Sequence, residues 1–169
     1  MIRPRRPGDL KRLVALLRAV YTSEGYPANW PNDPARWLAL GRAIVAWVCE
    51  EDGELVGHLA LTRPDPDRTW PQWQEALRAR PEGLAVMRRL FVAPDRRRGG
   101  IASDLLTTAK TEADKRGLHP VLDVSDDNRG AIAFWKAHGW RQVGEALLPP
   151  GDEGHPLRLV LLIGPRGFP

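Results

Sequence analysis

The fourteen residues Leu90-Phe91-Val92-Ala93-Pro94-Asp95-Arg96-Arg97-Arg98-Gly99-Gly100-Ile101-Ala102-Ser103 constrain the fold of this chain more than any other stretch. The order of residue types predicts a buried strand, a basic turn and the first turn of a helix. Adjacent glycines let backbone amides approach a ligand without a Cβ in the way. Helix N-termini leave amides unpaired and favour anions, so the stretch predicts a phosphate or pyrophosphate site.

Length and composition limit the classes of protein that remain. A chain of 169 residues is predicted to form one domain, residues 1–169. The single cysteine, Cys49, excludes an intrachain disulfide and a cysteine metal cluster, and no metal site is predicted. No apolar run reaches the roughly 18 residues of a membrane span, and no signal-peptide core follows Met1, so we expect a cytoplasmic protein without a membrane partner.

The N-terminal part predicts two helices followed by a hairpin. Apolar residues at helical spacing predict a helix over residues 8–21, and Asp33 before Pro34 is typical of the start of a second helix. Residues 44–50 and 55–62 are rich in β-forming residues and flank an Asp-Gly turn, which predicts a hairpin. Residues 63–83 are rich in proline, and we interpret them as an insertion or flap that contains a short helix near Pro71.

The C-terminal part alternates strands and helices. Strands are predicted at 85–93 and 121–124, helices at 100–116 and 131–138, and a closing hairpin at 140–147 and 157–163, joined by a Pro-Pro-Gly loop. The element order mixes a meander with strand–helix–strand crossovers. It therefore predicts an α/β (α+β) fold with a mixed sheet.

Three features occur together around the glycine turn. Arg97, Gly100 and Ala102 form an Arg-x-x-Gly-x-Ala pattern, Asn128 follows the next strand, and Ala131-Ile132-Ala133-Phe134-Trp135 runs on to Gly139-Trp140. With these features the chain resembles the GNAT superfamily of acyl-CoA-dependent N-acyltransferases, closely over residues 85–140. The resemblance implies a mostly antiparallel sheet of six to seven strands, about four flanking helices, and two central parallel strands that splay apart.

The resemblance also implies how acetyl-CoA, the acyl donor, is bound. Backbone amides of the turn would hold the pyrophosphate, and backbone groups of the preceding strand would pair with the pantetheine arm. Asn128 would hydrogen-bond the pantetheine, and Phe134 and Trp135 would line the thiol end. The implied cofactor-binding residues are Leu90, Phe91, Val92, Arg97, Arg98, Gly99, Gly100, Ile101, Ala102, Ser103, Asn128, Ala131, Phe134 and Trp135.

The catalytic groups depart from the family pattern. Many relatives carry tyrosine where Trp135 stands, and an indole N–H is not a useful acid at neutral pH. No acidic residue occupies residues 84–87, where some relatives carry a glutamate base. Asp123, Glu24 and His58 are the candidates for a base, and Tyr26 or Tyr21 for a hydroxyl. Asp123 and Tyr26 are the predicted catalytic residues.

The acceptor is predicted only as a class. Glu24, Tyr26 and Trp30 lie in the loop where relatives often build the acceptor pocket, and aromatic rings there could stack on a flat or cationic group. We expect an N-acetyltransferase that acts on a small-molecule or peptide primary amine, as a monomer or homodimer. Two alternatives stay open: a non-catalytic acyl-CoA sensor, and a basic nucleic-acid-binding protein. A net charge of +4 allows the latter, although nucleic acid is not the expected partner.

Overall fold

The computed structural model describes residues 1–150 and 154–165, so Gly151 of the predicted loop and the last residues of the predicted domain lie outside the described residues. The chain divides into two compact units. The first unit comprises Met1–Thr62 and Met87–Glu112, and the second comprises Arg63–Val86 and the described residues from Ala113 onward. The predictions of one domain, and of an insertion at 63–83, stay predictions.

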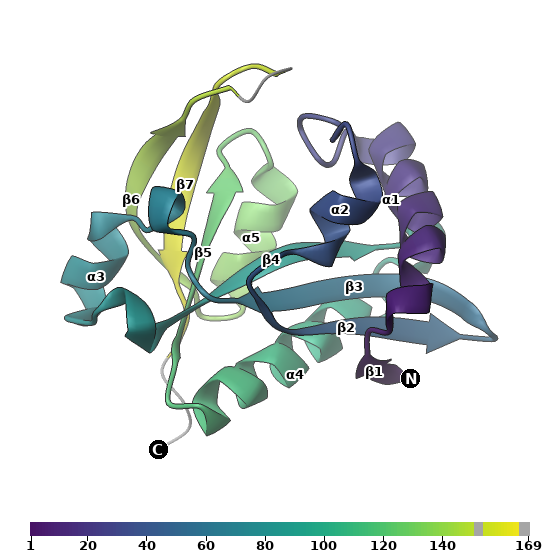
Figure 1. Cartoon of the computed structure of the whole chain (residues 1–169), viewed down its shortest axis with the longest axis horizontal. Coiled ribbons are helices and arrows are strands. Elements are labelled where there is room, and N and C mark those ends of the chain that lie inside the picture. Colours follow the sequence, from purple (N-terminus) through teal and green to yellow (C-terminus); the bar gives the residue numbers. More distant parts are fainter. Residues whose placement is uncertain (151–153, 166–169) are drawn as a thin grey trace. The chain divides into compact units, whose positions relative to one another are not determined.

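The first unit is built on a sheet with helices on both faces. In chain order its elements are β1 (Ile2–Pro4), the 3₁₀ turn η1 (Pro7–Asp9), α1 (Leu10–Glu24), α2 (Pro34–Ala39), β2 (Ala43–Glu51), β3 (Glu54–Thr62), most of β4 (Leu84–Val92), η4 (Pro94–Arg96) and most of α4 (Ile101–Lys115). β1 pairs antiparallel with β2, and β2 with β3. Figure 1 shows β2 and β3 side by side.

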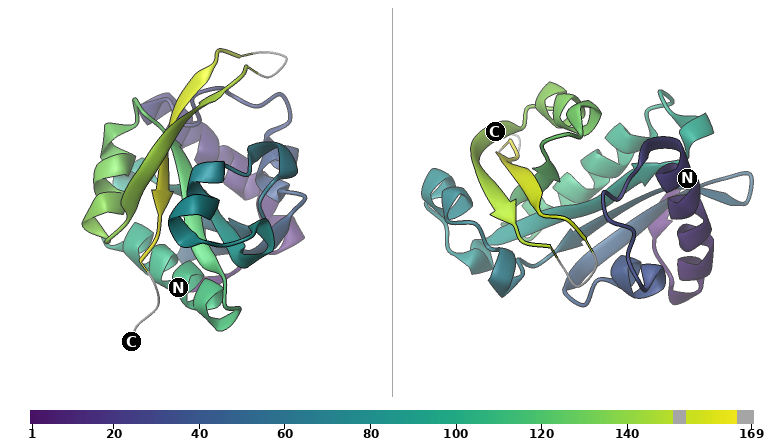
Figure 2. Two further views of the ribbon diagram at one scale, coloured as in Figure 1. Left: turned by 90° about the vertical axis from the view of Figure 1, so that its left-hand side faces the viewer. Right: turned by 90° about the horizontal axis from the view of Figure 1, so that it is seen from above.

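Two neighbouring residues of β3 show that helices cover both faces of this sheet. Gly57 faces α4, because a Cβ added there would lie 2.9 Å from Ile101 Cγ2. The next residue, His58, therefore points to the opposite face, where its ring stacks on Phe91. Phe91 belongs to the core that Leu13 and Leu17 of α1 form with α2. Figure 2 (right) shows α4 on one side of the strands and α1 and α2 on the other.

Helix ends of the first unit follow local rules. Asp33 caps α2 by accepting a hydrogen bond from the Arg36 amide (2.9 Å), with Pro34 at the first helical position, as predicted. α1 runs three residues beyond the predicted end. Gly25 closes it in the left-handed conformation (φ 71°), and its amide donates to the Tyr21 carbonyl.

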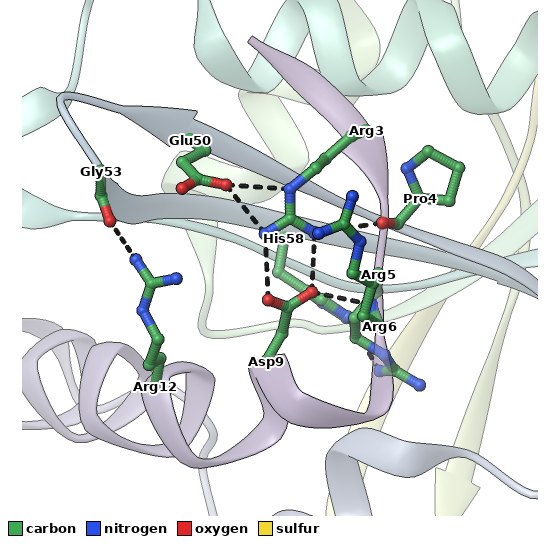
Figure 3. A network of polar contacts seen from close by, with 9 residues as sticks. All are labelled: Arg3, Pro4, Arg5, Arg6, Asp9, Arg12, Glu50, Gly53 and His58. Carbon is green, nitrogen blue, oxygen red and sulfur yellow. Dashed lines mark hydrogen bonds and ion pairs between the residues drawn. The ribbon is translucent and has the colours of Figure 1, made fainter.

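A polar network joins the start of the first unit to its sheet (Figure 3). The guanidinium of Arg3 contacts Asp9 and Glu50, each at 2.8 Å. The Asp9 carboxylate also accepts from the Arg6 amide (2.7 Å). These hydrogen bonds, from Arg3 above all, lower the pKa of Asp9 to about 2 although burial opposes the shift. The network fastens β1 and the start of α1 to β2.

The second unit has its own strands and core. Its elements are η2 (Pro66–Arg68), α3 (Pro71–Leu77), η3 (Pro81–Gly83), the start of β4, the end of α4, β5 (His119–Ser125), α5 (Arg129–Ala137), β6 (Arg141–Leu148) and β7 (Leu157–Ile163). Trp73 of α3 is fully buried and packs with Leu84, Val121 and Leu161. Residues 63–83 therefore supply part of this core. In Figure 2 (left), α3 and α5 lie on opposite sides of these strands.

The strands follow the order β1-β2-β3-β4-β5-β7-β6 in one hydrogen-bonded sheet. The pairing of β4 with β5 is parallel and runs from Leu84–His119 to Val86–Val121, after which each strand continues. β7 pairs antiparallel with both β5 and β6. The predicted mixed, mostly antiparallel sheet is confirmed, and it has seven strands in the described part of the chain. The described residues form five α-helices where about four were expected. None of these helices is long and apolar enough to cross a membrane.

Candidate functional site

The glycine turn has the predicted strand–turn–helix form and lies in the first unit. β4 ends at Val92, Pro94 begins the 3₁₀ turn η4, and α4 begins at Ile101. Arg98 (φ 63°) and Gly100 (φ 83°) both adopt left-handed backbone conformations. The Asp104 amide donates to the Gly100 carbonyl (3.0 Å) as the first helical hydrogen bond. The amides of Ile101 and Ala102 precede it and have no helical acceptor.

Space is open beside the turn. A Cβ added at Gly100 would have no atom within 4 Å, and one added at Gly99 would only touch the Arg96 carbonyl at 3.5 Å. A group that meets the turn at Gly100 therefore reaches backbone and not side chain. Open amides, a helix N-terminus and nearby arginines suit a bound phosphate, so the turn fits the pyrophosphate implied by the sequence.

Two arginines of the turn are ion-paired to other elements of the first unit. Arg97 Nη1 lies 2.5 Å from Glu24 Oε1 at the end of α1, and its Nη2 lies 3.5 Å from the Val92 carbonyl. Arg96 contacts Glu51 at 3.7 Å. The structure therefore brings together Glu24, predicted for the acceptor, and Arg97, predicted for the cofactor. No sequence signal indicated this pair, which crosses from α1 to the turn.

The end of β4 carries apolar side chains and an unusual backbone. Phe91 and Val92 are buried, and Leu90 is partly buried, so any ligand of this stretch would meet its backbone. Arg89, directly before them, has φ 59° inside the strand. Such a conformation is strained for a residue with a Cβ. Sequence reasoning missed it, because an arginine within a strand pattern carries no signal for a positive φ.

The predicted acceptor residues pack against other side chains. Tyr26 is partly buried, with its ring 6.3 Å from both Trp37 and Phe91. Trp30 packs 5.0 Å from Tyr21, and the guanidinium carbon of Arg18 lies 3.7 Å from its ring centroid. Arg18 therefore already fills one position where a cationic acceptor would stack on Trp30.

In the second unit, Asn128 is the N-cap of α5. Its side-chain oxygen accepts a hydrogen bond from the Ala131 amide (3.2 Å), so the residue is a helix cap. An asparagine amide has two N–H donors beyond this oxygen, so the cap leaves a pantetheine contact chemically possible. Trp135 is buried against Trp140, with ring centroids 4.9 Å apart, and Phe134 is partly buried beside it. The aromatic residues of α5 therefore have a packing role of their own.

The structure gives Asp123 hydrogen-bond partners within the second unit. Its Oδ1 accepts from Arg68 (2.8 Å) and its Oδ2 from Trp70 Nε1 (2.9 Å), and the side chain is only 6% exposed. A carboxylate held in this way ties residues 63–70 to β5. As a general base it would first have to give up these contacts.

His58 is fully buried in the first unit, and both its ring nitrogens are engaged. Burial, and to a smaller extent the charges of Arg5 and Arg89, lower the pKa of His58 to about 3. The ring is therefore neutral at physiological pH and has no free nitrogen for a substrate proton. This environment excludes His58 as a general base.

Comparison with known proteins identifies the family. Residues 10–140 match the family described as the acetyltransferase (GNAT) family. An uncharacterized N-acetyltransferase of Methanocaldococcus jannaschii is 32% identical over 115 residues, which is 68% of this chain and 46% of that protein. The chain thus spans less than half the length of this curated relative.

Solved structures agree on the fold. A ribosomal-protein-alanine N-acetyltransferase from Brucella melitensis aligns with a TM-score of 0.69 at 23% identity, covering 96% of this chain and 98% of that one. A protein of Salmonella typhimurium solved with its cofactor acetyl-CoA aligns with a TM-score of 0.68 at 17% identity, covering 100% and 96%. The family match covers well over half of the sequence, and the chain belongs to the GNAT family of acetyltransferases.

Proposed function

We propose that this chain transfers an acetyl group from acetyl-CoA to a primary amine. The turn between Val92 and Ile101 carries the proposal, because it presents helix N-terminal amides beside an open left-handed glycine and three arginines. Family membership supports the same donor. When bound, acetyl-CoA supplies the thioester that the amine attacks.

In this proposal the turn and the end of β4 hold the donor. Amides from Arg98 to Ser103 bind the pyrophosphate, and backbone groups of Leu90 and Val92 pair with the pantetheine. The Val92 amide polarises the thioester carbonyl, a kind of contact whose loss can lower a rate by about 10²–10³. The roles of Asn128, Ala131, Phe134 and Trp135 toward the cofactor stay predictions of the resemblance.

Proton removal from the acceptor is the remaining requirement. An amine with a lysine-like pKa of about 10.4 is protonated at pH 7, and deprotonating it costs about 4–5 kcal/mol. Of the predicted bases, Asp123 is engaged with Arg68 and Trp70, and Glu24 is ion-paired with Arg97. Tyr26 is the predicted catalytic residue that would supply a hydroxyl in the acceptor loop. Glu24 and Trp30 are proposed acceptor contacts in that loop. In this proposal the acceptor is a small-molecule or peptide amine. The protein acts as a monomer or homodimer in the cytoplasm.

Titration calorimetry with acetyl-CoA, together with release of free thiol across a panel of amines, tests this function. Binding with thiol release supports the transferase, and binding without release for any amine supports a non-catalytic acyl-CoA sensor. Affinity for DNA or RNA with a steep salt dependence, without acetyl-CoA binding, would support a nucleic-acid-binding protein. Absence of acetyl-CoA binding at millimolar concentration would overturn the proposal.

A matched pair of glycine variants locates the donor site. Gly100→Ala and Gly117→Ala both place a Cβ in open space at a left-handed position (φ 83° and 65°). Each variant should lose about 1 kcal/mol of stability from backbone strain. Only Gly100→Ala should weaken acetyl-CoA binding, by about tenfold or more, because its methyl group would occupy the space proposed for the phosphate. Equal affinities of the two variants would remove the turn from the donor site.

A further inference from the structure

His58 is the centre of a hydrogen-bonded chain in the first unit. Its Nδ1 lies 2.8 Å from the Arg89 carbonyl oxygen, and its Nε2 lies 3.2 Å from Arg5 Nη1. A carbonyl only accepts and a guanidinium only donates, so the ring must donate from Nδ1 and accept at Nε2. These two neighbours fix one neutral tautomer.

The chain continues to the end of α2. Arg5 also donates to the carbonyls of Leu38 and Ala39, the latter at 3.0 Å. Burial lowers the pKa of Arg5, although a guanidinium stays charged at physiological pH. Figure 3 shows Arg5 between β1 and His58. Through Arg5 and His58, the end of α2 is therefore connected to β4.

Arg89 is the residue of β4 that this chain reaches, and it is held at two points. His58 binds its carbonyl, and its guanidinium carbon lies 3.6 Å from the ring centroid of Trp37 in α2. A positive φ at a residue with a Cβ persists only where the surroundings enforce it, and such residues cluster at functional sites. The strained conformation directly precedes Leu90, where the proposed donor strand begins.

We propose that His58 is a positioning residue that holds the Arg89 carbonyl and thereby sets the direction of the Leu90–Val92 backbone toward acetyl-CoA. The expected effect of His58 on catalysis rests on the proposed function. Its expected effect on the backbone of β4 rests only on the hydrogen bonds and contacts described above. His58 touches neither substrate in this account, and it acts only through the backbone of Arg89.

Two amide variants separate the two hydrogen bonds of the ring. In His58→Asn the amide nitrogen can take the place of Nδ1 and donate to the Arg89 carbonyl, while the acceptor for Arg5 is lost. In His58→Gln the amide oxygen can take the place of Nε2 and accept from Arg5, while the donor to Arg89 is lost. Both variants lose the ring stack on Phe91, whose centroid lies 5.2 Å away, and they differ from each other in size by one methylene group.

The first measurement is amide hydrogen exchange, which needs no ligand. His58→Gln should raise exchange at Phe91 and Ala93, the second of which donates its amide to the Val56 carbonyl (2.8 Å), by at least tenfold over the wild type, and His58→Asn should leave it within about threefold. The melting temperatures of the two variants should fall by similar amounts. Equal exchange at these amides in both variants would overturn the proposal whether or not the protein is an enzyme.

The second measurement is steady-state kinetics with acetyl-CoA. His58→Gln should lower kcat by about tenfold to a hundredfold, since a misplacement of about 1 Å can cost 10² in rate. His58→Asn should keep kcat within about threefold. Because the ring stays neutral between Arg5 and Arg89, the acidic limb of the pH profile should be the same in His58→Asn and the wild type. A wild type that binds no acetyl-CoA would reject the proposed function and leave the exchange result standing.

Discussion

At the scale of single residues, Asn128 can serve both as a helix cap and as a ligand contact. Its Oδ1 caps α5 through the Ala131 amide, so Asn128→Ala should cost about 1 kcal/mol of stability. Asn128→Asp keeps the capping oxygen but loses the N–H donors proposed for the pantetheine. We expect Asn128→Asp to retain the wild-type stability and to bind acetyl-CoA at least tenfold more weakly. Thermal unfolding and calorimetry on both variants check this.

The outcome for Asn128 would also separate its two roles. Wild-type affinity in Asn128→Asp would leave the residue only a cap. Unchanged stability in Asn128→Ala would instead show that capping does not explain why asparagine occupies position 128.

Single residues also show where sequence reasoning stops. The role of Gly100 could be predicted, because a glycine pair directly before a helical pattern indicates a turn whose backbone amides a ligand can approach. The partners of Asp123 could not, since Arg68 and Trp70 lie 55 and 53 positions away and meet it only in the folded chain. The same holds for Arg5 and His58, which are separated by 53 positions. The sequence therefore suggested Asp123 and His58 as general bases, whereas in the fold their hydrogen bonds hold separate elements together.

At the scale of elements, the junction of β1, η1 and α1 depends on one carboxylate. Arg3 holds the pKa of Asp9 at about 2 in the folded protein, against 3.8 for a free side chain. The folded state therefore binds the Asp9 proton less tightly than the unfolded state does. The contribution of Asp9 is complete above about pH 5 and is lost progressively as the pH falls from about 5 to about 1. The shift corresponds to about 2 kcal/mol.

We expect Asp9→Asn to lower the free energy of unfolding by about 2 kcal/mol at pH 7 and by much less near pH 2.5. Denaturant unfolding across this range measures the difference from the wild type, so other titrating groups cancel. Glu54→Gln removes one charge from an exposed site at the start of β3 and should change stability little at any pH. A pH-independent cost of Asp9→Asn would show that the ion pair is not its source.

Elements with strong local signals were predictable from the sequence. The Asp-Gly turn gives β2 and β3 their hairpin, and Asp33-Pro34 marks the start of α2. The place of β7 between β5 and β6 was not predictable, because the hairpin pattern fixes only that β6 and β7 are neighbours. Which of them pairs with β5 depends on the packing of Leu159, Leu161 and Ile163 with the second core.

At the scale of the whole molecule, each unit carries its own core. Trp73 and Leu17 are fully buried, the first in the core of the second unit and the second in that of the first. Trp73→Ala should cost about 3–5 kcal/mol and Leu17→Ala about 2–5 kcal/mol, because each leaves a cavity that its surroundings fill only in part. A mobile flap at residues 63–83 would instead make Trp73→Ala nearly neutral.

Hydrogen exchange shows where each loss is felt. Contacts broken by Trp73→Ala belong to the second unit, so the amides of β5 and β7 should exchange faster while those of β2 and β3 keep most of their protection. Leu17→Ala should show the reverse pattern. β4 and α4 run through both units, so exchange of their amides reports whether the two cores open together. We expect each variant to raise exchange in β4 and α4 less than in the strands of its own core. Equal loss of protection in all strands for both variants would mean that the two cores open only together, as a single cooperative unit.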